Sequence, residues 1–388
     1  MTLEEHVAQV NGAAFWKEFT LAENTFAPKP GQELELADNL VWFGDFALVL
    51  QLKEREAPTE DPAAEATWFA RKVLDKATSQ VRDSLRFLDE QPQISVTNAR
   101  GQAFDIRRAD LADVVKIVVY QPGKALPDEQ ARKRFHVSRT AGFIHLLDIE
   151  DYRGILDTLR VPEDIRRYFA YREQVAPKIE DAGVEEPDIM GAFIGEAELP
   201  VAGMREILGR LVQDYDAFDL SSLIGNLHDH IEKDEHPLAY YRIMLQFALV
   251  PRSVWRAIKE RFLLSLEAAK AGEFKMPYRL TFPDSRCTFM ITPLHPDVPK
   301  EGPEREKARI AGLTNLTRLA KYDHKTPKAV GIQVGYEGEH VTIDWTLIEQ
   351  DWVQDDETEK MLAERNPFRS ASEKKVDSFF VVNLPEGA

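Results

Sequence analysis

Residues 37–53 read ADNLVWFGDFALVLQLK, and this stretch contains two apolar runs separated by a short polar break. The break is Gly44-Asp45, a dipeptide with turn chemistry, and the runs on either side are rich in Leu, Val and Phe. Apolar runs of this length that flank a two-residue turn are typical of a β-hairpin. We therefore expect residues 40–43 and 46–52 to form two paired antiparallel strands.

Three polar side chains lie at the open end of this hairpin. Gln51 and Lys53 are two positions apart, so they project from the same face of the second strand. Asp38 lies at the matching end of the first strand, because a hairpin aligns positions that are equidistant from its turn. The sequence predicts that Asp38, Gln51 and Lys53 converge.

A carboxylate, an amide oxygen and an ammonium together suit the hydrolysis of a phosphodiester. Mg²⁺ accepts oxygen ligands from one or two side chains and keeps several waters. A bound metal polarises the phosphorus centre and acidifies a water, and a nearby lysine orients that water or stabilises the transition state. Asp38 and Gln51 are thus candidate ligands of Mg²⁺ or Mn²⁺, and Lys53 is a candidate catalytic residue.

This arrangement resembles the PD-(D/E)xK nuclease superfamily. The opening E-x-x-D, Glu35 and Asp38, is most similar to NERD-type and Mrr-like domains. The resemblance covers roughly residues 1–122 and implies a restriction-endonuclease-like αβββαβ core. It also implies metal-dependent cleavage of DNA in bacterial defence or DNA repair, with nothing in the residues to choose between these roles.

The chain departs from the pattern at Gln51, which stands where most members have a second acid. An amide brings no charge, so the site binds metal more weakly unless another carboxylate joins it. The family often places such an acid on its first helix. Glu18, in the segment FWKEF, is the preferred candidate, and Glu5 is the alternative.

Residues 65–90 carry an apolar stripe at four-residue spacing and are predicted to form a helix. Lys72, Lys76 and Gln80 run beside that stripe. Related nuclease domains have a glutamine on this helix with a basic residue one turn earlier. The resemblance therefore implies that Lys76 and Gln80 support the site or bind a phosphate.

Other interpretations remain open. One alternative is that Asp38 is a turn acid and Lys53 a solvated strand end, since a lone D-x12-Q-x-K arises by chance in many proteins. Degenerate members of the superfamily persist as protein-interaction modules, which is the main alternative function. RNA or a nucleotide is a further possible substrate on the same scaffold.

The net charge of −17 weighs against a nucleic-acid partner, because phosphate binding usually needs a basic face. Two local clusters are basic: the helix 65–90, and the segment EQARKRFHVSR with Arg132, Lys133, Arg134 and Arg139. Each is equally explained as a solvated face. One possibility is that a partner protein binds the DNA. A homodimer would provide the two active sites that cleavage of both DNA strands needs.

Length and composition indicate a globular chain of several domains. We expect α/β (α+β) architecture: the nuclease-like domain at 1–122, a bridging strand and helices at 123–175, a helical region at 176–272 and a smaller α+β domain at 273–388. The single Cys287 excludes an intrachain disulfide, and no long apolar run or signal-like N-terminus occurs. A cytoplasmic protein without a membrane partner is expected.

The remaining segments carry little chemistry. The three histidines of LHDHIEKDEH, His228, His230 and His236, are better explained by a capping turn than by a metal site. In the last domain, residues 330–334 and 341–345 are expected to pair around a turn at 335–338, and residues 379–384 to close the sheet.

Overall fold

The structure is a computed structural model that describes residues 1–29, 32–179, 183–221, 223–224 and 238–369. The fold is mixed α/β with several sheets, and it divides into two compact units between Asp214 and Tyr215. Each unit is described by itself.

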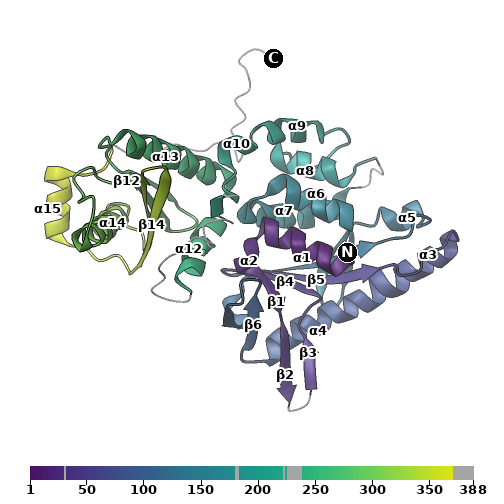
Figure 1. Cartoon of the computed structure of the whole chain (residues 1–388). Coiled ribbons are helices and arrows are strands. Elements are labelled where there is room, and N and C mark those ends of the chain that lie inside the picture. The colour runs from purple at the N-terminus through teal and green to yellow at the C-terminus, as the bar shows by residue number, and fades with distance from the viewer. Residues whose placement is uncertain (30–31, 180–182, 222, 225–237, 370–388) are drawn as a thin grey trace. The chain divides into compact units, whose positions relative to one another are not determined.

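The first unit is built on one eight-stranded sheet (Figure 1). Its order is β7-β6-β1-β4-β5-β8-β10-β9, in which β5, β8 and β10 are parallel neighbours and the other pairs are antiparallel. The strands are β1 (Thr20–Glu23), β4 (Asn39–Phe43), β5 (Phe46–Glu54), β6 (Ile94–Asn98), β7 (Ala103–Ile106), β8 (Asp113–Gln121), β9 (Phe135–Ser138) and β10 (Gly142–Asp148). The segment expected to bridge domains therefore contributes β9 and β10 to the same sheet.

The predicted hairpin is confirmed as β4 and β5. Phe43 pairs with Phe46, so the connection is only two residues long. Gly44 has a φ of 59°, a backbone conformation that glycine adopts at little cost and that tight hairpin turns need. Every residue of β4 is buried, because helices cover both faces of the sheet.

Helices cover the two faces of this sheet unequally (Figure 1). One face is covered by a single long helix made of three consecutive segments: α3 (Pro62–Trp68), η1 (Phe69–Lys76) and α4 (Ala77–Glu90). The other face carries a larger helical layer, in which α1 and α6 contact the central strands. The helices of this layer are α1 (Leu3–Ala14), α2 (Trp16–Phe19), α6 (Ile149–Leu159), α7 (Pro162–Val175), α8 (Glu186–Ile194) and α9 (Glu206–Gln213).

The long helix confirms the predicted one, with one difference in its middle. The segment η1 is π-helical, and at its end the Ala77 N–H donates to the carbonyl of Lys72, five residues earlier. Segments of this kind are rare and are frequent at functional sites. Lys72 and Lys76, the basic residues noted in the sequence, both lie on it.

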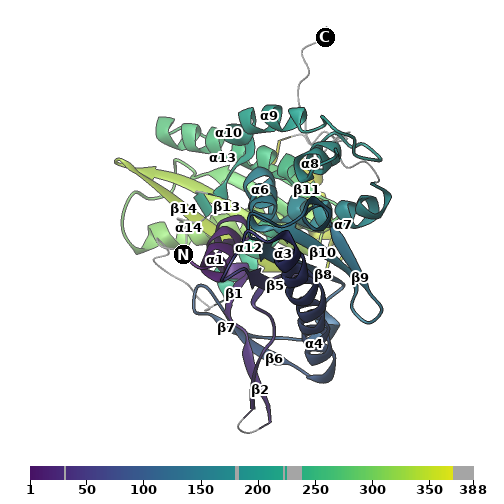
Figure 2. The same ribbon diagram turned by 90° about the vertical axis from the view of Figure 1, so that its right-hand side faces the viewer.

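Smaller elements complete the first unit. The strands β2 (Thr25–Lys29) and β3 (Gln32–Glu35) form a separate hairpin that extends away from the main sheet in both views (Figures 1 and 2). The Phe26 ring contacts that of Phe87 at 5.3 Å, which ties this hairpin to the end of α4. The short helices are η2 (Arg108–Asp110), α5 (Asp128–Ala131) and η3 (Ala176–Lys178).

The second unit contains a four-stranded sheet in the order β11-β12-β13-β14. The β12 strand is buried along its whole length because α14 packs on one face and α13 on the other. The elements are α10 (Tyr215–Phe218), α12 (Ala239–Ala248), α13 (Arg252–Ala271), β11 (Tyr278–Phe282), β12 (Cys287–Pro293), α14 (Pro303–Asp323), β13 (Lys328–Glu337), β14 (His340–Glu349) and α15 (Asp356–Arg365).

Pairing of the last two strands is confirmed, but the predicted turn is too long. The β13 strand continues through Glu337, which pairs with His340. The turn is therefore Gly338-Glu339, and Gly338 has the positive φ of 63° that such a turn needs. The histidines His228, His230 and His236 and the expected strand at 379–384 lie outside the described residues.

Among the residues that the structure describes, no helix is both long enough and apolar enough to cross a membrane.

Candidate active site

The hairpin brings Asp38 and Lys53 together as predicted. Asn39 pairs with Leu50, so Asp38 lies opposite Gln51 at the open end of β4 and β5. Asp38 Oδ2 accepts a hydrogen bond from the Leu52 N–H at 2.6 Å and one from Lys53 Nζ at 3.2 Å. A carboxylate and an ammonium are thus held at one edge of the sheet.

Gln51 projects toward the helix that covers this face. Its Nε2 donates to Ser84 Oγ, on α4, over a long 3.5 Å. Its Oε1 is buried and has no hydrogen-bond partner among the described residues. A buried carbonyl oxygen without a donor is costly, and a cation or an ordered water would satisfy it.

Both negative and positive side chains act on the Lys53 ammonium. Burial lowers the pKa of its ammonium, the nearby Asp38 carboxylate opposes that shift, and the positive charges of Lys76 and Lys72 lower the pKa further. The π-helical segment η1 therefore aims two lysines at the end of β5. Gln80, one turn beyond Lys76, also has a buried Oε1 without a partner in the described part of the chain.

Glu18 lies elsewhere, which corrects its expected role as a metal ligand. It belongs to α2, just before β1, and Thr20 pairs with Val41 in the middle of β4. Glu18 thus lies beside the turn end of β4, about 16 Å from Asp38 at the usual rise per strand residue. Its carboxylate forms a buried ion pair with Arg100 at 2.9 Å, which gives it a structural role.

Glu35 is the acid that the structure brings toward Asp38. It ends β3, three residues before Asp38. Burial raises the pKa of Glu35, and the negative charges of Asp38 and Glu4 raise it further. The E-x-x-D spacing was the signal that could have marked it as a candidate ligand. Glu5, the other acid considered, instead accepts from the Thr2 N–H in a capping box at the start of α1.

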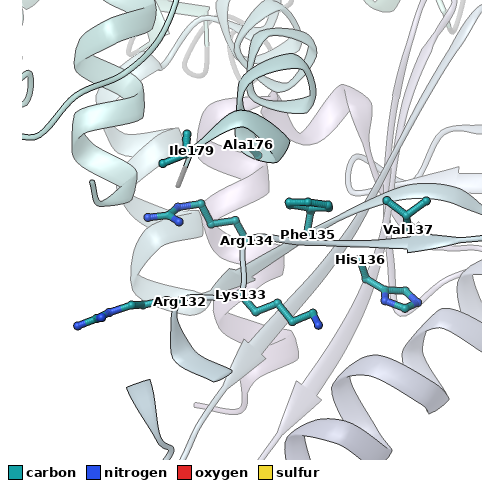
Figure 3. A pocket seen from close by; sticks show the side chains of 8 residues that line it. All are labelled: Arg132, Lys133, Arg134, Phe135, His136, Val137, Ala176 and Ile179. Carbon is teal, nitrogen blue, oxygen red and sulfur yellow. The ribbon is translucent and has the colours of Figure 1, made fainter. Parts of the chain in front are cut away.

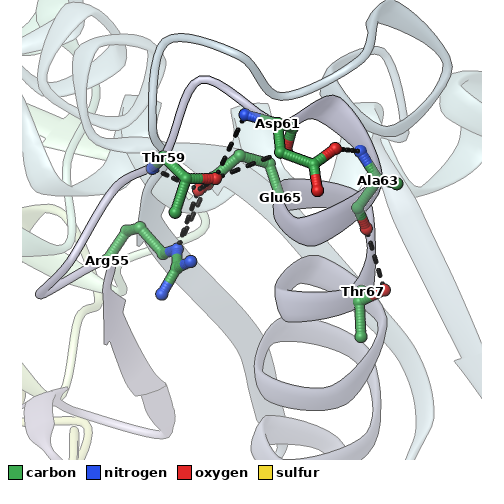
Figure 4. Close-up of polar contacts among 6 residues, drawn as sticks. All are labelled: Arg55, Thr59, Asp61, Ala63, Glu65 and Thr67. Atoms are coloured by element: carbon green, nitrogen blue, oxygen red, sulfur yellow. Dashed lines mark hydrogen bonds and ion pairs between the residues drawn. The ribbon is translucent and has the colours of Figure 1, made fainter.

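The chain that leaves the site after Lys53 is fixed by Glu65 (Figure 4). Its buried carboxylate accepts from the Thr59 N–H at 2.9 Å and from Arg55 Nε at 3.0 Å. The hydrogen bond from Thr59 is the largest of the effects that lower the pKa of Glu65. A Cβ added to Gly123 would lie 2.6 Å from Glu65 Oε2, so only glycine fits beside this anchor. Loop 55–61 is thereby held between the site strand and α3.

The donor set fits a hard cation that keeps most of its waters. No group of three Asp, Glu, His or Cys side chains in the described ranges is arranged to hold a metal ion. Mg²⁺ does not require one, because it is commonly bound through one or two carboxylates together with waters and substrate phosphates. Asp38 supplies a carboxylate, Gln51 supplies a buried amide oxygen, and the charge of Asp38 acts on Glu35.

Neither a protein-family model, nor a curated protein, nor a solved structure matches the chain.

Proposed function

We propose that the first unit is a metal-dependent nuclease that hydrolyses phosphodiester bonds in DNA. The observation that supports this most strongly is the meeting of Asp38, Lys53 and the buried Gln51 oxygen at one edge of the sheet. Three groups with complementary roles in phosphate chemistry occupy one small region there, beside two further lysines.

Each residue has a defined part in this proposal. Asp38 and Gln51 hold Mg²⁺ or Mn²⁺, and Glu35, whose pKa the charge of Asp38 raises, is the candidate for a second carboxylate. The metal, when bound, polarises the phosphate and acidifies a water. Lys53 donates to the water or to a non-bridging phosphate oxygen, where an ammonium stabilises the charge of the transition state. Lys76 and Gln80 act from the covering helix, on the same phosphate or its neighbour.

The positioning of Lys53 supports this role. Its ammonium donates to Asp38 Oδ2 and to the Leu52 carbonyl, at 3.2 and 2.6 Å. These two acceptors hold the side chain at the sheet edge instead of letting it extend into solvent. A cation that is already in position needs little free energy to reorient during the reaction. This preorganisation is the main source of electrostatic catalysis.

The alternative is an interaction module that keeps the architecture without catalysis. The neutral Gln51 and the ion pair that already engages Lys53 favour it. The two functions differ in metal affinity, because catalysis requires a divalent cation at Asp38 and an interaction module does not.

The test is to incubate the full chain with supercoiled plasmid, single-stranded DNA and RNA of the same sequence, each with Mg²⁺, Mn²⁺ or EDTA. The proposal predicts cleavage of DNA that EDTA abolishes. Cleavage of RNA alone would change the substrate class. Intact substrates in every reaction, together with no heat of Mn²⁺ binding in calorimetry, would favour the interaction module.

A further inference from the structure

A hollow of about 360 Å³ lies where the chain enters β9, in the basic segment noted in the sequence (Figure 3). Arg132, Lys133, Arg134 and His136 line it, and Ala176 and Ile179 close one side. In Figure 3 Lys133 and His136 point to the same side of the chain, while Arg134 points toward Ile179. Three consecutive residues, Arg132 to Arg134, thus bring cationic side chains to the hollow from two sides of the chain.

The positive charge of this hollow is only partly neutralised. Arg134 donates to the Val184 carbonyl, which carries no net charge. Arg132 pairs with Asp128 at 3.1 Å, but both side chains are more than half exposed, so the pair is weak. Among the described residues, no carboxylate lies within ion-pair distance of the Lys133 ammonium. In a chain of net charge −17, such an excess of cations suits an anion.

The hollow is level with the candidate active site on the same sheet. Gln51 pairs with Val118, and Val118 pairs with Leu146. The Leu146 N–H donates to the Arg134 carbonyl at 2.9 Å, which completes the row. Three steps between strands span about 14 Å.

The π-helical segment η1 carries charged residues near both places. Lys72 and Lys76, on η1, lie near Lys53. Asp75, on the same segment, acts on His136 of the hollow and opposes the pKa shift that burial and Lys133 cause. The segment η1 therefore connects the two regions, with lysines toward the candidate active site.

We propose that this hollow binds a backbone phosphate of the nucleic-acid strand, about 14 Å from the bond that is cleaved. The proposal rests on the proposed function and names where its substrate is held. A nucleic-acid strand fits better than free phosphate because the hollow also offers the Phe135 ring and the exposed Val137. Cations beside an aromatic ring are typical of sites for nucleic-acid strands.

The test measures binding separately from cleavage. The full chain is titrated in EDTA against fluorescein-labelled single-stranded and duplex DNA, and anisotropy is recorded at several salt concentrations. The variant combines Arg132→Gln with Lys133→Gln. The control combines Arg153→Gln with Lys307→Gln, which removes the same charge from exposed side chains. Arg153 pairs with Asp157 four residues away, as Arg132 does with Asp128.

We expect the variant to bind DNA at least about threefold more weakly at low salt, with a slope of log K against log salt smaller by about 1–2. The control should match the wild type. Equal affinities and slopes for all three proteins would overturn the proposal. So would a variant that loses binding of inorganic phosphate in calorimetry but binds DNA as before, because the hollow would then be a site for free phosphate.

Cleavage by the same proteins in Mg²⁺ separates the two proposals. Weaker DNA binding by the variant, without cleavage by the wild type, would support the hollow as a strand-binding site and contradict the nuclease. Cleavage by the wild type with unchanged binding by the variant would support the nuclease and overturn the assignment of the hollow.

Discussion

The amide oxygen of Gln51 is buried and has no donor in the described part of the chain, and Gln51 lies opposite Asp38 across β4 and β5. In a domain that holds no metal, this arrangement would lower the stability of the fold, because a buried carbonyl oxygen needs a hydrogen-bond partner. If a cation is its partner, a carboxylate at this position should bind the cation more tightly. Gln51 thus allows the metal to be tested without reference to cleavage.

We expect Gln51→Glu to lower the stability of the metal-free protein by about 2 kcal/mol, since it buries a charge. Added Mn²⁺ should restore that stability, because a ligand that binds only the folded state stabilises it. Thermal melting with EDTA and with Mn²⁺ measures both effects. Gln333→Glu is the matched control: Gln333 is also a buried strand glutamine whose Oε1 has no partner among the described residues. Its loss of stability should not respond to Mn²⁺, and equal responses of both variants would contradict the site.

Glu35 and Glu18 separate the role of a metal ligand from that of a structural acid. Glu35→Gln removes a charge near Asp38 and should weaken Mn²⁺ binding by about 1 kcal/mol, roughly fivefold in Kd. Glu18→Gln should leave Mn²⁺ affinity unchanged but lower stability by about 3 kcal/mol, because it removes one charge of a buried ion pair with Arg100. Calorimetry and chemical denaturation distinguish these outcomes. Weaker Mn²⁺ binding by the Glu18 variant alone would reverse the assignment.

At the scale of single residues, the sequence pattern predicted correctly those positions that depend only on the alternation of side chains along a strand. Asp38 and Lys53 meet because a two-residue turn and a period of two place them on one face. The position of Glu18 could not be predicted in this way. It depends on how β1 pairs with β4, a contact between separate elements that no local pattern specifies.

Among the elements, the second sheet shows how closely a helix can approach a strand. A Cβ added to Gly331, on β13, would lie 2.0 Å from Thr317 Oγ1 of α14 and 2.9 Å from Thr346 of β14. Gly312, on α14 itself, has no atom within 4 Å of such a Cβ. Close packing therefore requires glycine at position 331, whereas position 312 has room for a side chain.

Gly331→Ala should destabilise the protein by about 1–3 kcal/mol through overpacking. Gly312→Ala should stabilise it by up to about 1 kcal/mol, since alanine is the better helix residue. Denaturant unfolding of the two variants beside the wild type measures both changes. Similar effects of the two substitutions would show that α14 does not pack on Gly331 as described.

The start of α6 should make stability depend on pH. Burial, followed by the charges of Asp148 and Glu186, raises the pKa of Asp151 to about 7. The folded state therefore binds this proton more tightly than the unfolded chain. The resulting stability is present below the unfolded pKa of about 4 and is lost as pH rises to about 7.

Asp151→Asn removes this titration, so the variant should gain stability relative to the wild type between pH 5 and pH 8. Asp157→Asn, on the same helix, controls for the loss of one negative charge. Denaturation at the two pH values measures the difference. A constant difference between Asp151→Asn and the wild type would contradict the raised pKa.

At the scale of elements, strong periodicity predicted the strands and helices that matter for the site. The strands at 40–43 and 46–52 and the helix at 65–90 are present, with slightly longer bounds. The π-helical form of η1 could not be predicted, because the apolar stripe has nearly the same spacing in either helix. The turn expected at 335–338 was misplaced, because β13 continues through Glu337 and the turn is Gly338-Glu339.

For the whole molecule, the charge distribution matters more than the net charge. A chain of charge −17 repels nucleic acid over most of its surface. The first sheet nevertheless brings Lys53, the lysines of η1 and the basic segment at β9 to one edge. This arrangement comes from parallel pairing of β5, β8 and β10, which places their carboxyl ends together.

The central claim is that Asp38 and Lys53 hydrolyse DNA with a divalent metal. The most direct measurement is the rate of plasmid nicking in Mn²⁺ by the wild type, Lys53→Ala and Lys328→Ala. Lys328 is the matched control, a strand lysine paired with Glu349 at 3.4 Å as Lys53 is with Asp38 at 3.2 Å. We predict that Lys53→Ala loses about 100-fold or more in rate while Lys328→Ala nicks as fast as the wild type. Equal nicking by all three folded proteins, or none by the wild type, would contradict the claim.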